Sequence, residues 1–181
     1  SPERMVPGIK KIQKMHNSYG VTTVKLAEGR INWAEGAALL EQQNGLTMRI
    51  MVSWDWGSHY SPHTAEEAEK FALGWKDRAS DLLDARSIKV FYDGALDSYT
   101  ALLLDDYEGR PGFKGKSHRP KEEFYEGIKR INKNGIGVIV HVMGDGSARE
   151  LVDTFERVRQ ENGDNDAVLH LSHAVMARPQ D

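Results

Sequence analysis

Three titratable side chains stand within or at the ends of predicted strands: Lys89, His141 and His173. His141 ends the apolar run 138–140 (VIV), and the turn-forming residues 144–146 (GDG) follow shortly after it. An apolar run bounded by glycines is typical of a strand buried on both faces, as in a parallel sheet. The carboxyl ends of such strands bind ligands in α/β folds, so His141 stands where chemistry is expected.

Alternation along the strands would bring these three side chains together. In each predicted strand the titratable residue shares its face with two others: Lys89 with Phe91 and Asp93, His141 with Ile139 and Met143, and His173 with Leu169 and Leu171. If those faces point inward, Lys89, His141 and His173 converge at one end of a barrel or sheet.

Each of the three also has a plain structural interpretation. A single histidine at the end of a strand is more often a hydrogen-bonded structural residue than a ligand, and we interpret His170 in that way. A lysine within a strand is usually an edge residue whose stem covers apolar surface. Lys89, however, is flanked by Ile88, Val90 and Phe91, and a buried ammonium is costly unless it is modified, paired or shifted in pKa. Taken together, the three residues favour a functional site.

Helices and strands alternate along the chain. Helices are predicted at 1–17 and 34–43, after the capping box of Thr64 and Glu67, from Pro120, and from a second capping box at 147–150. Strands are predicted at 20–24, 46–54, 86–93, around 138–141, and at 167–174. Strict alternation implies a parallel sheet with helical crossovers, so residues 1–181 are predicted to form one α/β domain.

Composition narrows the class of protein. Of the 181 residues, 39% are hydrophobic and 28% charged, which indicates a globular chain. The formal net charge of −3 argues against nucleic acid or an anionic membrane as partner. There is no cysteine, so a metal would be held by His, Asp, Glu or a modified Lys. The sequence shows no signal peptide and no apolar run long enough to span a membrane, and we expect a cytoplasmic protein.

Four segments resemble the amidohydrolase superfamily, in its family 3 branch, which includes the N-substituted formamide deformylases. The segments fall in the family's order and cover most of the chain. They are 19–24 (YGVTTV), 87–104 (SIKVFYDGALDSYTALLL), 141–145 (HVMGD) and 169–181 (LHLSHAVMARPQD). The resemblance implies a (β/α)₈ barrel of the metal-dependent hydrolase fold, of which this chain would supply strands two to six.

The same resemblance implies a metal centre and a reaction. Lys89 would be the fourth-strand lysine, carboxylated so that it can bridge two metals, and His141 and His173 would be ligands at the ends of strands five and six. A carbamate supplies hard oxygen ligands and neutral imidazole suits zinc. The implied cofactor is one or two divalent metals, zinc by preference, and the implied substrate is a small non-peptide amide.

The chain also departs from the family pattern. The family's His-x-His pair is absent before Lys89, and the spacing of His59 and His63 is too wide to replace it. The family's strand-eight aspartate is absent as well. A complete barrel takes about 250 residues, so the chain is predicted to be a central part of a barrel, cut at both ends. We expect it to bind metal weakly or not at all and to be inactive alone.

Further residues are candidates for substrate contacts. Trp54 and Trp56 follow a strand and could wall a pocket, or could pack between strand and helix. Asp97 and Tyr99 stand where the family has Gly and Arg, in a loop predicted over 94–119, which is long for a connection without function. Asp145 could accept a hydrogen bond from His141, or could be a turn residue.

Two other functions remain open on sequence grounds. Lys89 could be the Schiff-base lysine of a lyase, since lysines with a depressed pKa do that chemistry. Alternatively, the chain could be a truncated barrel without catalytic activity. In either case an open five-stranded sheet has two exposed edges, which predicts self-association into a homo-oligomer or an edge covered by a helix.

Overall fold

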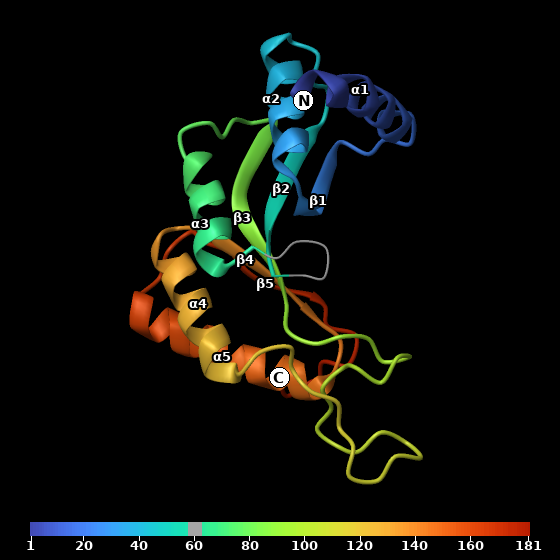
Figure 1. Cartoon of the computed structure of the whole chain (residues 1–181), viewed down its shortest axis with the longest axis vertical. Helices are drawn as coiled ribbons and strands as arrows, with labels where there is room; N and C mark the ends of the chain where they lie inside the picture. The colour runs from blue at the N-terminus through green and yellow to red at the C-terminus, as the bar shows by residue number, and fades with distance from the viewer. Residues whose placement is uncertain (58–62) are drawn as a thin grey trace.

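The described residues contain one sheet of five parallel strands. The computed structural model describes residues 1–57 and 63–181. The strands lie in sequence order, and every neighbouring pair is parallel (Figure 1). They are β1 (Thr23–Gly29), β2 (Arg49–Trp56), β3 (Leu83–Phe91), β4 (Gly137–Val142) and β5 (Leu169–His173). The predicted fold class, a partial (β/α)₈ barrel of parallel strands, is confirmed by this arrangement.

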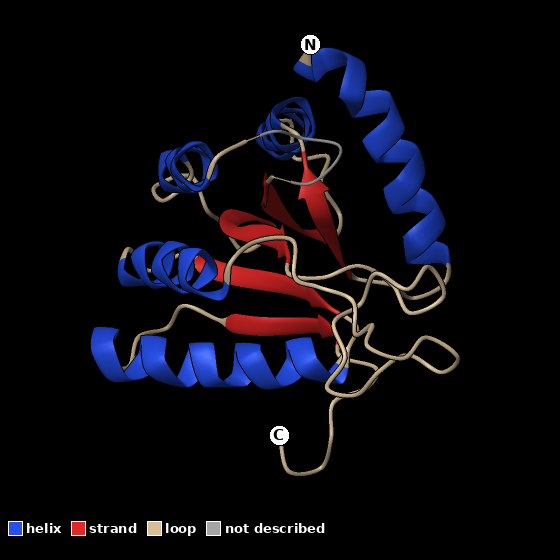
Figure 2. Cartoon of the chain, turned by 60° about the horizontal axis from the view of Figure 1, so that its bottom comes forward, coloured by secondary structure: helices blue, strands red, loops and turns tan. Residues whose placement is uncertain are grey.

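A helix precedes each strand, and α2 to α5 together cover one side of the curved sheet. Figure 2 shows α2 to α5 around the outer side, while the loops gather where the strands end. The helices are α1 (Pro2–Ser18), α2 (Ile31–Gln42), α3 (Ala65–Gly74), α4 (Lys121–Lys133) and α5 (Asp145–Asn162). Helices that connect parallel strands pack against one face of the sheet, which leaves the opposite face of the strands free of α2 to α5.

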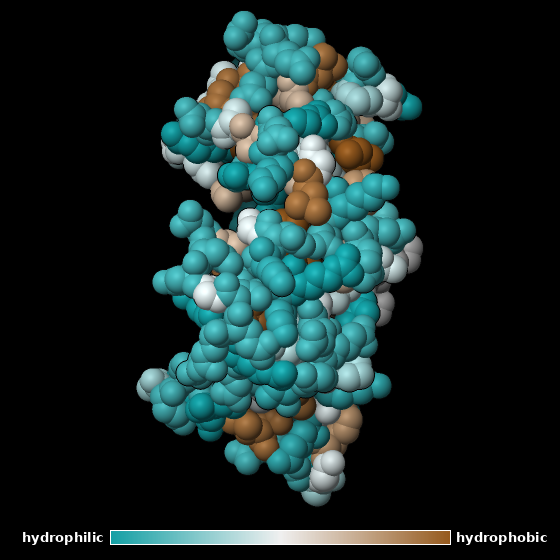
Figure 3. Space-filling model, turned by 90° about the vertical axis from the view of Figure 1, so that its left-hand side faces the viewer, coloured by the Kyte–Doolittle hydropathy of each residue, from teal (hydrophilic) through white to brown (hydrophobic). Residues whose placement is uncertain are grey.

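The core lies between the outer face of the sheet and these helices. On β3 and β4 the outward-facing residues Ile88, Val90, Val138 and Val140 are completely buried. Phe124 and Ile128 of α4 are also completely buried, because the apolar face of an amphipathic helix packs on the sheet. The surface over the side that carries α3 and α4 is mostly hydrophilic (Figure 3), as expected for the outside of a barrel.

One of the two predicted capping boxes is present. Thr64 accepts from the backbone N–H of Glu67, and the Glu67 side chain accepts from that of Thr64, at the start of α3. The box predicted at 147–150 is wrong, because α5 begins at Asp145. Ser147 instead donates to Asp93, and Glu150 accepts from the Tyr92 hydroxyl. Ser147 and Glu150 thus bond to residues distant in sequence rather than forming a capping box with each other.

No helix within the described ranges is long and apolar enough to cross a membrane.

Candidate functional site

Two histidine rings meet at the carboxyl end of the sheet. His141 is near the end of β4 and His173 is the last residue of β5. Their ring centroids are 4.7 Å apart, with planes inclined at 69°. The convergence expected from the sequence therefore exists for these two side chains, although they reach each other differently from the prediction.

His173 reaches His141 through an unusual backbone. In the β4–β5 register His173 pairs with Val142, whereas His170 and Ser172 pair with Ile139 and His141. Register alone would therefore put His173 on the outer face of the sheet. His173 and Ala174 both have a left-handed backbone, with φ of 76° and 46°, and this turn at the strand end carries the imidazole towards His141.

The expectation that Leu169 and Leu171 share an inward face with His173 is wrong for the two leucines. Both are partly buried against the hydrophobic core, on the helix side of the sheet. The alternation rule holds only while the backbone stays extended, and it ends where φ becomes positive at His173.

A backbone carbonyl fixes the orientation of the His141 ring. Nε2 of His141 lies 2.9 Å from the carbonyl oxygen of Gly94. A carbonyl can only accept, so the proton of the neutral ring sits on Nε2 and the lone pair on Nδ1. Burial lowers the pKa of His141, and the charges of Lys89 and His173 lower it further. The ring is therefore held neutral, with Nδ1 available as a ligand.

Lys89 is a buried lysine without a hydrogen-bond partner. The residue is 3% exposed, and Nζ has no hydrogen-bond partner within the described part of the chain. Burial lowers the pKa of Lys89 to about 8, against the opposing effect of the carboxylates of Glu28 and Asp55. Asp55 is opposite Lys89 in the β2–β3 register and is itself buried. An unpaired buried amine of this kind is poised either for modification or for nucleophilic chemistry.

Phe91 lies between the lysine and the histidines. The Nζ atom of Lys89 is 3.8 Å from the centroid of the Phe91 ring, and that ring is 4.7 Å from the His141 ring, centroid to centroid. Lys89, Phe91, His141 and His173 thus form one continuous row on the inner side of the sheet. The sequence placed Phe91 on the Lys89 face but did not identify it as a member of the site.

The sequence prediction missed the role of Asp93. Its carboxylate is completely buried and accepts four hydrogen bonds, from the backbone N–H groups of Leu102, Met143 and Gly144 and from the Ser147 hydroxyl. The sequence signals were the Asp-Gly step after a strand and the alternation that put Asp93 on the Lys89 face. Its partners, 9 to 54 residues away along the chain, were not readable locally.

Asp145 binds the long loop rather than His141. Its Oδ1 atom accepts a 3.0 Å hydrogen bond from the backbone N–H of Leu104, while the hydrogen bond of His141 runs to Gly94. The structure therefore places Asp145 as an anchor for the loop over 94–119. This role differs from both alternatives that the sequence left open.

Asp97 and Tyr99 lie on an exposed turn of that loop. Tyr99 has a left-handed backbone, with φ of 58°, and its side chain is 38% exposed. The guanidinium of Arg110 stacks on the Tyr99 ring at 3.5 Å. Thr100 returns the chain to the site, because its carbonyl accepts from the backbone N–H of Gly94. A substrate contact for Asp97 and Tyr99 stays a prediction.

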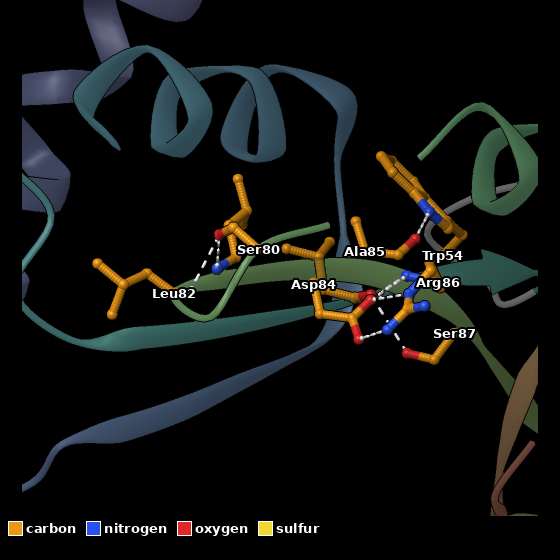
Figure 4. A network of polar contacts seen from close by, with 9 residues as sticks. Trp54, Ser80, Leu82, Asp84, Ala85, Arg86 and Ser87 are labelled. Atoms are coloured by element: carbon orange, nitrogen blue, oxygen red, sulfur yellow. Dashed lines mark hydrogen bonds and ion pairs between the residues drawn. The ribbon is translucent and has the colours of Figure 1, made fainter. Parts of the chain in front are cut away.

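Trp54 and Trp56 lie on the helix side of the sheet. Trp54 stacks on Phe71 at 5.2 Å, and its Nε1 donates to the carbonyl of Ala85 at 2.6 Å (Figure 4). Trp56 packs on Phe124, at 5.5 Å between ring centroids. Both indoles are at most 3% exposed. Of the two alternatives for this pair, the structure shows the packing between strand and helix, and a substrate contact stays a prediction.

The donors fit part of a metal site. Within the described ranges, no group of three or more His, Asp and Glu side chains could hold a metal ion. The two neighbouring imidazoles and the unpaired Lys89 amine are the donors that remain, and the lysine would need a carbamate to serve as a ligand. His59 lies outside the described residues, and His63 packs edge-on against Phe71 instead.

Comparisons with known proteins agree with this geometry. A sequence model described as the amidohydrolase family matches residues 1–181. The chain is 30% identical over 100 residues to protein LONG AFTER FAR-RED 3 of Arabidopsis thaliana, which is 55% of this chain and 17% of that protein. It is 31% identical over 99 residues to the N-substituted formamide deformylase of Arthrobacter pascens, which is 54% of this chain and 18% of that protein.

A solved structure shares the fold. An uncharacterized metal-dependent hydrolase from Pyrococcus horikoshii superposes with a TM-score of 0.75 at 20% identity, over 99% of this chain and 34% of that one. The chain thus spans about a third of this structure, and its matches span less than a fifth of the two sequence relatives.

Proposed function

The chain belongs to the amidohydrolase family, and from this premise we propose that it forms part of a metal-dependent hydrolase of carbon–nitrogen bonds in small non-peptide amides. The observation that carries the proposal is the row of Lys89, His141 and His173 at the carboxyl end of parallel strands. There, two imidazoles lie 4.7 Å apart and an amine is buried without a partner. The name of the deformylase relative supports an amide as the substrate class.

In the proposal three residues hold the metal. His141 offers Nδ1, because its Nε2 proton is bound by Gly94. His173 offers its imidazole from the neighbouring strand, and Lys89 offers carbamate oxygens after reaction with CO₂. Carboxylation converts the ammonium, which is costly to bury, into an anion that a cation can compensate. A bound zinc ion would supply Lewis acidity and a nucleophile at neutral pH.

The chain's own residues would do the rest. Phe91 excludes water from one side of the Lys89 amine. Asp93 and Gly94 orient His141, and Asp145 ties the 94–119 loop to the same end of the sheet. No residue among these is placed to transfer a proton to a leaving amine, a role that is typically worth 10²–10⁴-fold in rate. We therefore propose that residues 1–181 alone bind zinc weakly and have no measurable amidase activity.

The test measures zinc binding and lysine carboxylation separately. Calorimetric titration with zinc is run with and without ¹³C-labelled bicarbonate, and the ¹³C spectrum is searched for a carbamate signal. We expect weak binding that strengthens with bicarbonate, and at least a tenfold loss of affinity in His141→Ala and His173→Ala. His16→Ala is the matched control, because His16 lies on α1 and its ring Nδ1 contacts the carbonyl of Ile12 in the same helix.

Three results would contradict the proposal. Equal zinc affinity in the His16, His141 and His173 variants would show that the metal binds elsewhere. Trapping of a Lys89 adduct by borohydride with a carbonyl compound, without any zinc binding, would favour the Schiff-base lyase. Stoichiometric zinc and fast amide turnover by residues 1–181 would instead show that the site is complete as it stands.

A further inference from the structure

We propose that Asp93 is a positioning residue that sets the tautomer of His141 by holding the carbonyl of Gly94 against Nε2. The inference concerns the ring proton of His141 in the metal-free chain. It rests on the proposed function only in the step that offers the free Nδ1 to a metal.

Asp93 holds both ends of the Gly94–His141 hydrogen bond. On one side it directly precedes Gly94 in the chain. On the other side its Oδ1 accepts from the backbone N–H of Met143, two residues after His141, at 3.0 Å. One rigid carboxylate therefore fixes the acceptor peptide and the strand that carries the donor ring. A shift of either would lengthen the 2.9 Å contact between Nε2 and the Gly94 oxygen.

The other oxygen of Asp93 fastens the surrounding backbone. Oδ2 accepts from the N–H of Leu102 at 3.0 Å, from that of Gly144 at 3.0 Å, and from the Ser147 hydroxyl at 2.7 Å. These contacts bring the 94–119 loop and the first turn of α5 onto the same carboxylate. A buried anion that accepts several N–H bonds is strongly localised, because each bond lost would leave a buried donor unpaired.

The peptide at Gly94 has little freedom to compensate. A Cβ atom at this position would lie 2.0 Å from Oγ1 of Thr100. Thr100 therefore approaches the Gly94 backbone so closely that only glycine fits there. The N–H of Gly94 is in turn bound by the Thr100 carbonyl at 3.1 Å. The Gly94 carbonyl shares its peptide plane with the N–H of Ala95, which donates to Oγ1 of Thr100 at 2.9 Å. Asp93 in turn holds Leu102, two residues after Thr100, so the orientation of the Gly94 carbonyl depends on Thr100 and Asp93 together.

A purely structural role for Asp93 is the competing explanation. Asp93 accepts from the backbone N–H of Gly144, the N-cap of α5, and from the hydroxyl of Ser147 in the first turn, so it fastens the start of that helix. Loss of these bonds would lower stability without changing which ring nitrogen of His141 carries the proton. The tautomer is therefore the readout that separates the two roles.

The experiment follows the ring nitrogens of His141 by ¹⁵N NMR in the 181-residue chain at pH 8, without metal. We expect the wild-type proton to lie mainly on Nε2, with a small fraction of the Nδ1–H tautomer. In Asp93→Asn the amide group can no longer accept at one of the two oxygen positions, so a bond that holds Met143 or the 94–119 loop is lost and the contact between the Gly94 carbonyl and Nε2 loosens. The ratio of the Nδ1–H to the Nε2–H tautomer should then rise roughly fivefold, the equivalent of one neutral hydrogen bond.

Asp145→Asn is the matched control. It makes the same chemical change at a carboxylate that binds the same loop, through Leu104, but it does not touch Gly94 or Met143. We expect it to leave the tautomer of His141 unchanged. Ser147→Ala removes one of the four bonds to Asp93, and should shift the tautomer in the same direction by a smaller factor.

The inference is overturned if a folded Asp93→Asn chain keeps the His141 proton on Nε2. If Asp93→Asn does not fold, an unchanged tautomer in Ser147→Ala overturns it. Zinc titration of the same samples distinguishes the two proposals. A tautomer shift without zinc binding in any sample keeps the role of Asp93 and ends the metal proposal. Zinc binding with an unshifted tautomer in the variants keeps the metal proposal and ends the role of Asp93.

Discussion

The central strands and the edge strand supply the site in different ways. On β3 and β4, Lys89 and His141 alternate with completely buried residues such as Ile88 and Val140, and their backbone is extended. On β5, His173 is exposed, and it reaches the site through a left-handed turn at the edge of the sheet. The core therefore fixes two of the three candidate ligands, while the third depends on local backbone geometry.

This difference indicates which parts of the site tolerate change. Packing and register both specify the position of Lys89 and His141 on the central strands, and the bond from Met143 to Asp93 holds the end of β4 as well. The edge strand has one neighbour, β4, and Leu169 and Leu171 are only partly buried. Mutations should therefore affect stability through β3 and β4, and the geometry of the imidazole pair through β5.

The largest expected effect is a cavity in the centre of the sheet. Ile88→Ala removes a completely buried side chain and should lower the free energy of unfolding by about 2–5 kcal/mol. Leu171→Ala, half-buried on β5, should cost only about 1–2 kcal/mol, because less apolar surface is lost. Urea unfolding of the two variants measures both. Equal losses would show that the edge strand is packed as firmly as the centre.

Self-association through the sheet edges is the next prediction. β1 and β5 are the edges of the described sheet, and edges present unpaired N–H and C=O groups. Thr23→Lys places a charge on the exposed edge of β1 and should weaken association roughly tenfold, which corresponds to about 1.4 kcal/mol. Thr22→Lys, one residue before the strand, is the control. Sedimentation velocity over a range of concentrations measures both, and a monodisperse wild-type monomer would contradict the prediction.

The pH dependence of stability should report on Lys89. Burial lowers its pKa to about 8, so between pH 8 and about 10.5 the unfolded chain keeps a proton that the folded chain has released. The free energy of unfolding therefore rises with pH across this window. Below pH 8 the folded chain carries the buried ammonium, and its full destabilising effect is present. The titratable groups that interact with this amine include the carboxylates of Glu28 and Asp55 and the imidazoles of His141 and His170.

Lys89→Met should remove this rise and make the chain more stable at pH 7. Lys10→Met, on the exposed side of α1, is the control for loss of a lysine. Urea unfolding at pH 7, 8, 9 and 10 gives the difference between wild type and each variant. A constant difference for Lys89→Met would mean that the amine is solvated or already carboxylated in the folded chain.

Much of the architecture followed from local pattern, and much of the site did not. Alternating helices and strands implied parallel pairing, and the end of an apolar run located His141. The position of His173 depended on two positive φ angles that alternation cannot anticipate. Asp93 depended on partners up to 54 residues away. The side of the sheet on which Trp54 and Trp56 lie could be assigned only from the register of β2. Periodicity specifies the faces of one strand, whereas hydrogen bonds between distant segments require the folded chain.

The smallest expected effect lies at the turn after β5. Ala174 has φ of 46°, a conformation that costs an L-residue with a Cβ about 1–2 kcal/mol. Ala174→Gly relieves that cost but loses more chain entropy on folding. The net gain in stability should therefore be below about 1 kcal/mol. His173 should meanwhile become more mobile, because glycine no longer holds the turn in one conformation. Thermal unfolding measures the first effect, and ¹⁵N relaxation of the His173 ring measures the second.

Ala177→Gly, three residues further along the same exposed segment, is the control for the general effect of an added glycine. If Ala174→Gly instead destabilised the chain by several kcal/mol, the left-handed turn would be a firmly packed part of the site, and the contrast between central and edge strands would disappear.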